Sequence, residues 1–200
     1  YVRARLESVI LFDPATQTAE KIDAPLSNTH YMYCMFNDAW IVYLDANMDG
    51  GGRIMAMPRD GGDAVVVKDV YTGQPKLQLD GNYLAWMERT GSRMDKLFVC
   101  DLTTLESTTV QMFSDSPYGQ SDPSLKNGLL VWADAGDSAD VSQIFRIRLS
   151  QSTAVPYSPN TYVHDPQGDE SCLAWLTGHH GVGTDLYCSV NGGPAVLVDS

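Results

Sequence analysis

Short hydrophobic runs, separated by turn residues, recur along the chain at a nearly constant interval. The four strongest runs each place an aromatic residue among aliphatic ones, and they occupy residues 40–44, 83–87, 129–133 and 172–176. Their aromatic anchors are Tyr43, Trp86, Trp132 and Trp175, spaced 43, 46 and 43 residues apart. An apolar repeat with a period in the forties is typical of the blades of a β-propeller.

Three further runs accompany each anchor run. A weaker run precedes it, at residues 30–35, 76–79, 122–125 and 162–167. A second apolar run follows it, at residues 53–57, 96–102, 143–147 and 185–190. A short β-branched run closes the repeat, at residues 64–67, 107–111, 153–155 and 195–198. Runs of this length broken by turn residues predict four strands per repeat and almost no helix.

The beginning of the chain matches only the second half of this repeat. Residues 9–13 and 16–22 align with the last two strands, and Ile10 precedes Ile54 by 44 residues, one more period. We therefore predict an all-β fold, a β-propeller of four-stranded antiparallel blades with four full blades and an N-terminal half-blade. The half-blade spans residues 1–24, and the blades span residues 28–70, 74–113, 121–156 and 162–199. Because blades stack on their neighbours, we expect the ring to belong to a larger protein or to be incompletely closed.

Turn and strand residues in the last two repeats resemble a known family. Asp122-Pro123 leads through Asn127-Gly128 to Trp132, and Asp165-Pro166 leads through Asp169 to Trp175. The chain resembles the TolB-type propeller repeat, which is shared with the N-terminal propellers of dipeptidyl peptidases and prolyl oligopeptidases. The resemblance implies the fold. It carries over no catalytic residue, because nothing here resembles the hydrolase domain of those peptidases.

Composition narrows the classes of partner. The 200 residues carry a net charge of −12, with 13 Lys and Arg against 25 Asp and Glu, which argues against nucleic acid and anionic membranes as partners. No apolar run is long enough for membrane insertion. The four cysteines fall in or beside predicted strands, as expected of small buried side chains. Cys172 and Cys188 lie on neighbouring strands, so a disulfide between them is left open.

Blade geometry groups the candidate binding residues. In a propeller the loops between the second and third strands share one face with the links between blades, and all four histidines and many acidic residues fall there. Binding residues gather on loops held by a rigid scaffold. The alternative is that these loops are simply polar. The candidate ligand-binding residues are His30, Asp122, His164, Asp165, His179 and His180. Within this set we expect His164 and Asp165 to form a hydrogen-bonded pair, and His179-His180 to be an exposed loop.

Residues 45–50 fit the start of a calcium loop. Asp45, Asn47 and Asp49 would supply oxygen ligands at alternate positions, followed by Gly50 for the turn. The match fails further on, where Arg53 replaces a ligand and the bidentate Glu is missing. We therefore expect no cofactor, with calcium at these three residues as the alternative.

These observations favour a non-catalytic module for ligand or protein binding, or for sensing, within a larger extracytoplasmic bacterial protein. Its partner would be a protein or peptide. One alternative is a propeller glycosidase or lyase that uses carboxylates at the channel face, such as Asp122 and Asp165. Another is a structural domain that docks a neighbouring domain of the same protein. No Ser/His/Asp or Gly-x-Ser-x-Gly pattern indicates a hydrolase.

Overall fold

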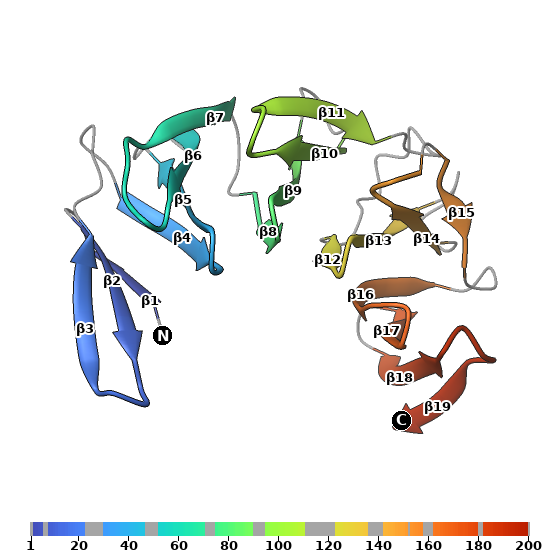
Figure 1. The fold of residues 1–200 in the computed structure, drawn as a ribbon. Coiled ribbons are helices and arrows are strands. Elements are labelled where there is room, and N and C mark those ends of the chain that lie inside the picture. Colours follow the sequence, from blue (N-terminus) through green and yellow to red (C-terminus); the bar gives the residue numbers. More distant parts are fainter. Residues whose placement is uncertain are drawn as a thin grey trace. The chain divides into compact units, whose positions relative to one another are not determined.

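The computed structural model describes residues 2–5, 8–22, 30–46, 52–70, 75–89, 95–110, 123–135, 142–151, 153–157, 162–179 and 182–199. These residues contain nineteen strands in five sheets and no helix (Figure 1). The chain separates into two compact units. Unit 1 comprises Tyr1–Leu84 and Cys100–Ser107, and unit 2 comprises Ala85–Val99 and Thr108–Ser200.

Strands follow one another in sequence order within every sheet. The first sheet contains β1 (Val2–Arg5), β2 (Ser8–Asp13) and β3 (Thr18–Ile22). The second contains β4 (His30–Phe36), β5 (Trp40–Ala46), β6 (Gly52–Pro58) and β7 (Val65–Val70). The third contains β8 (Leu77–Asp80), β9 (Tyr83–Arg89), β10 (Asp95–Asp101) and β11 (Glu106–Val110). The fourth contains β12 (Ser124–Lys126), β13 (Leu129–Ala135), β14 (Ser142–Arg148) and β15 (Val155–Pro156). The fifth contains β16 (Val163–Gly168), β17 (Cys172–His179), β18 (Val182–Val190) and β19 (Val196–Asp199).

The predicted pattern of four-stranded antiparallel sheets is confirmed. The first sheet differs in having a third strand, β1, which the sequence reading missed because Arg3 and Arg5 interrupt its apolar residues. β1 pairs with β2 from Val2 opposite Leu11 to Arg5 opposite Ser8. The predicted blade boundaries stay a prediction, because the links between successive sheets lie outside the described residues.

Strand β13, the second strand of the fourth sheet, is buried on both faces. Its residues Leu130 and Trp132 pack in a cluster with residues of the third sheet, namely Ala85, Met87, Leu97 and Val99. Its residues Leu129 and Val131 pack in another cluster with residues of the fifth sheet, namely Val163, Leu173 and Trp175. Because successive side chains of a strand point to opposite faces, burial on both faces explains why this run is continuously apolar instead of alternating.

The aromatic anchors form the same cross-strand contact in three sheets. Each of the three anchor tryptophans stacks on an aromatic ring of the next strand: Trp86 on Phe98 at 5.4 Å, Trp132 on Phe145 at 5.9 Å, and Trp175 on Tyr187 at 6.3 Å between ring centroids. Trp86, Trp132 and Tyr43 are fully buried, and Trp175 is 4% exposed. Their interpretation as core residues is therefore confirmed.

Turns between the first and second strands of successive sheets are joined by hydrogen bonds. In unit 1, the Asn37 side chain donates to the Gly81 carbonyl at 2.7 Å, and Trp40 Nε1 donates to Asn82 Oδ1 at 2.9 Å. In unit 2, Asn127 Nδ2 donates to Asp169 Oδ2 at 2.8 Å. A side-chain amide thus links neighbouring sheets by a hydrogen bond at two equivalent turns.

Asp169 organises the turn at which it lies. Its Oδ1 accepts hydrogen bonds from the Ser171 hydroxyl and backbone amide and from the Cys172 amide, while Lys126 Nζ lies 3.6 Å from Oδ2. These donors stabilise the ionised form, so the pKa of Asp169 lies well below its usual range, with the Ser171 hydroxyl as the largest cause.

The cysteines are free thiols. Cys172 lies opposite Val190 and Cys188 lies opposite Ala174, so the two thiols are diagonal neighbours, too far apart for a disulfide in this register. Burial raises the pKa of the Cys34 thiol to about 12 and also raises that of Cys100. Both remain neutral core side chains.

Replacing Trp132 by alanine tests the importance of the core between the sheets. Trp132→Ala should lower the free energy of unfolding by about 3–5 kcal/mol, because it removes a buried aromatic and leaves a cavity. Denaturant unfolding measures the change. Val155→Ala, at a position 45% exposed, is the control and should change stability by less than about 0.5 kcal/mol. Equal losses in the two variants would contradict the assignment.

The Asp169 turn predicts a pH-dependent stability. Because the folded pKa is depressed, the stabilisation is complete above the unfolded pKa of about 3.9 and is lost as pH falls through the folded pKa. Asp169→Ala should therefore lower Tm at neutral pH, and the difference from the wild type should shrink as pH falls below about 4. Thermal melts measure this, with the exposed Asp60→Ala as control. A difference that does not change with pH would contradict the role of the carboxylate.

Candidate functional site

His164 and Asp165 form the predicted hydrogen-bonded pair, with His164 Nδ1 3.0 Å from Asp165 Oδ2. The pair lies near the start of β16, where the register against β17 shifts between His164 and Gln167. Asp165 has a φ of +50°, in the left-handed region. Both side chains reach solvent, with exposed fractions of 30% for His164 and 53% for Asp165. The ring of Tyr162 lies edge-on to His164, with 6.0 Å between centroids.

Buried residues on either side hold this exposed pair in place. Val163 is 2% exposed and packs in the core shared with the fourth sheet, and Pro166 is also buried. Ser142 Oγ, on β14, both donates to the Val163 carbonyl and accepts from the Val163 amide, at 2.6 Å each. The backbone that carries His164 and Asp165 is therefore attached to the neighbouring sheet, which preorganises the pair.

The other predicted binding residues are not brought together by the described part of the chain. His30 opens β4 opposite Ala46, and His179 lies at the end of β17 opposite Val182, but their side chains lie outside what the structure describes. Asp122 and His180 lie outside the described residues altogether. The shared binding face therefore stays a prediction beyond the pair itself.

Asp45, the first residue of the possible calcium loop, is held by a cation of the protein. Asp45 faces Arg53 across β5 and β6, and the Arg53 guanidinium donates to Asp45 Oδ2 at 2.9 Å. The Asp45 side chain is only 1% exposed. Asn47 and Asp49 lie outside the described residues. Among the residues that the structure does describe, no group of three or more His, Cys, Asp or Glu is arranged to hold a metal ion.

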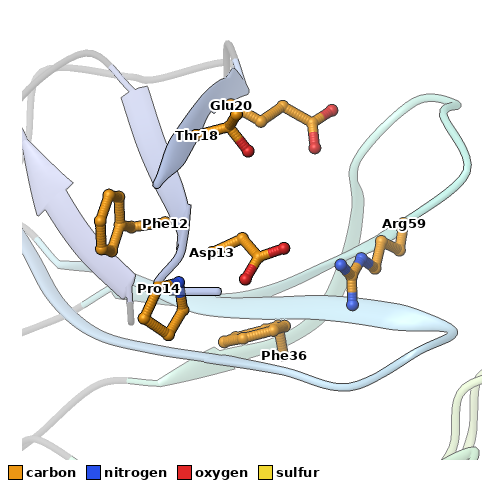
Figure 2. A pocket seen from close by; sticks show the side chains of 7 residues that line it. All are labelled: Phe12, Asp13, Pro14, Thr18, Glu20, Phe36 and Arg59. Atoms are coloured by element: carbon orange, nitrogen blue, oxygen red, sulfur yellow. The ribbon is translucent and has the colours of Figure 1, made fainter. Parts of the chain in front are cut away.

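A pocket that the sequence reading missed lies in unit 1, between the first and second sheets. Its volume is about 390 Å³, and its lining comes from hairpin turns and strand ends, namely Phe12, Asp13, Pro14, Thr18, Glu20, Phe36 and Arg59. Figure 2 shows the carboxylates of Asp13 and Glu20 and the guanidinium of Arg59 around a space bordered by the Phe36 ring. The available signal was an aromatic residue directly before a polar turn, at Phe12-Asp13-Pro14 and Phe36-Asn37-Asp38.

Comparisons with known proteins support the fold. A putative TolB from Agrobacterium tumefaciens is 13% identical, with a TM-score of 0.62 over 98% of this chain and 75% of that chain. TolB from Acinetobacter baumannii is 11% identical, with a TM-score of 0.61 over 96% of this chain and 48% of that chain. A prolyl endopeptidase structure, from a study of two such enzymes and their inter-domain dynamics, is 13% identical, with a TM-score of 0.67 over 85% of this chain and 29% of that chain.

These likenesses establish a β-propeller fold of the TolB type, as the repeat predicted. At such low identity they show the fold alone. The chain spans about three quarters of one TolB structure and about half of the other. Neither the protein-family models nor the curated proteins contain a match. Within the described ranges, no helix is long and apolar enough to cross a membrane.

The ion pair at Asp45 leads to a prediction about calcium. Because Arg53 already neutralises Asp45, we expect no change in Tm when calcium or a chelator is added. A site filled at about 100 times its Kd would add about 2.7 kcal/mol, which corresponds to a rise in Tm of roughly 5–10 °C. Thermal melts with calcium, with chelator, and with magnesium as control distinguish the outcomes, and a calcium-specific rise would contradict the expectation.

Proposed function

We propose that this chain is a non-catalytic binding module for a protein or peptide, within a larger extracytoplasmic bacterial protein. The observation that carries the proposal is the solvent-accessible His164–Asp165 pair at the register shift between β16 and β17, where Asp165 has left-handed backbone. The His164 imidazole and the Asp165 carboxylate supply polar groups for hydrogen bonding, and the buried residues beside them hold both in place. Such an arrangement is suited to recognising polar groups of a partner.

Backbone strain at Asp165 supports a binding role. A non-glycine residue in the left-handed region costs on the order of 1 kcal/mol, and such residues concentrate at functional sites. Glycine would relieve this strain but would remove the carboxylate. The Asp165 side chain is 53% exposed, so core packing does not require it, although packing fixes its backbone through Val163 and Ser142.

The alternative of glycoside hydrolysis rests on Asp122 and Asp165, and Asp122 lies outside the described residues. A glycosidase needs one carboxyl group whose raised pKa keeps it protonated as a general acid. The described aspartates with shifted pKa values, Asp13, Asp101 and Asp169, are all shifted downward, chiefly by hydrogen bonds from backbone amides and hydroxyl groups. Such groups are permanent acceptors and anions at neutral pH.

The charge of the chain indicates the chemistry of the partner. With a net charge of −12, the module would attract a basic segment and steer its approach.

The proposed setting is a larger extracytoplasmic protein. The two bacterial TolB structures that share the fold are longer than the part of them that this chain matches, which is consistent with that setting. Fractionation of the producing cells with an antibody against the chain tests the extracytoplasmic location, and a purely cytoplasmic signal would contradict it.

Selection of peptides tests the binding proposal. Random dodecapeptides displayed on phage should yield basic sequences that bind the purified wild-type protein, with affinities measured by calorimetry. Asp165→Gly should preserve or raise Tm, because it relieves the left-handed backbone, and should weaken binding by about tenfold or more. Asp122→Asn combined with Asp165→Asn should weaken binding further.

Two controls separate binding from folding. Glu106→Gln removes an exposed carboxylate on β11 and should leave peptide affinity unchanged. Ser142→Ala removes the hydroxyl group that positions Val163 and should weaken binding while His164 and Asp165 are still present. Selected peptides that bind the Asp165 variants as tightly as the wild type would overturn the proposal.

A further inference from the structure

The pocket in unit 1 lies among hairpin turns and contains none of the residues of the proposed binding site. Asp13 and Pro14 come from the turn between β2 and β3, Phe36 ends β4, and Arg59 follows β6. In the second sheet, the turns that follow Phe36 and Pro58 lie at the opposite end of the strands from the connection between β5 and β6. We propose that this pocket is a second binding site, which accepts a lysine side chain of a protein partner.

The acidic wall supplies the recognition of a cation. Asp13 Oδ1 accepts a hydrogen bond from the Ala15 amide at 2.8 Å, which fixes the carboxylate beside the pocket. This backbone bond and the Thr16 hydroxyl lower the pKa of Asp13, so the group is an anion at neutral pH. Glu20 adds a second carboxylate, and no described residue forms an ion pair with it. An ammonium group has three donors, which suits a pocket with more than one acceptor.

Arg59 does not convert the pocket into an anion site. Its Nη1 donates to the Asn37 carbonyl at 3.2 Å and lies 3.7 Å from Asp38 Oδ1, so its charge is partly balanced within its own sheet. Its guanidinium carbon lies 5.3 Å from the centroid of the Phe36 ring. An incoming anion would meet two carboxylates facing it, whereas an incoming cation meets one guanidinium that already has partners.

Aromatic exposure explains why a long alkyl stem suits the site. Phe12 is 39% exposed and Phe36 is 38% exposed, although burial would favour both rings. Figure 2 shows the Phe36 ring at the border of the space between the acids and Arg59. A lysine side chain would lay its methylene groups on this apolar surface and direct its ammonium to the acidic wall. The volume of about 390 Å³ accommodates such a chain.

Nuclear magnetic resonance titration of the whole chain tests the proposal. The probe is the tripeptide glycine-lysine-glycine, acetylated and amidated, and the matched control replaces its lysine by glutamine. We expect a Kd on the order of 1 mM for the lysine peptide, with amide shifts at Asp13, Glu20 and Phe36 and weaker binding at high salt. Free L-lysine should bind less well, because its α-carboxylate faces the same acids. Tighter binding of free L-lysine would overturn the assignment to a protein partner.

Neutral substitutions of the acidic and basic residues of the pocket test which charge the ligand carries. Glu20→Gln, which removes no described structural contact, should weaken lysine-peptide binding by about threefold to tenfold, and Asp13→Asn keeps the turn acceptor while adding a similar loss. Arg59→Gln should leave the affinity unchanged or raise it. Glu106→Gln on β11 is the control and should have no effect. Equal binding of the glutamine peptide, an unchanged Kd in Glu20→Gln, or tighter binding of a glutamate peptide would overturn the proposal.

Discussion

The structure depends on burying the apolar faces of its sheets against neighbouring sheets. A sheet of four short strands cannot shield its own apolar surface, so it needs a neighbouring sheet to cover it. β13 shows how one strand meets this requirement, sending Leu130 and Trp132 to one neighbouring sheet and Leu129 and Val131 to the other. The stacked aromatic pairs repeat in three sheets, where each adds a large apolar area to the core.

Polar contacts at the turns determine how neighbouring sheets are aligned. Burial of apolar area is not directional, whereas the amides of Asn37 and Asn127 and the indole of Trp40 need specific acceptors on the next sheet. Two kinds of interaction therefore act between neighbouring sheets. Packing holds the sheets together, and hydrogen bonds at the turns decide which residue of one sheet meets which residue of the next.

Much of the fold could be predicted from the sequence, because the repeat exposes the strand pattern through Tyr43, Trp86, Trp132 and Trp175. β1 escaped prediction because the pairing of Val2 and Ala4 with β2 outweighs the local signal of two arginines. The hydrogen bond between His164 and Asp165 was predicted from adjacency, but the left-handed backbone and the attachment to Ser142 depend on tertiary contacts. The aromatic residues before the turns at Asp13 and Asn37 were a local signal, but the pocket beside Phe36 joins turns that are distant in sequence, so its assembly depends on tertiary contacts.

Burial of β13 on both faces also has a consequence for local opening. Detaching the fourth sheet from unit 2 would expose apolar residues of the third and fifth sheets at the same moment, along with its own. The free energy of that opening therefore includes two interfaces, which disfavours partial unfolding within this unit. Backbone amides of the fourth sheet would then exchange with solvent mainly through cooperative opening that involves its neighbours. The repeats of unit 2 are separate segments of the chain, but their stabilities are coupled.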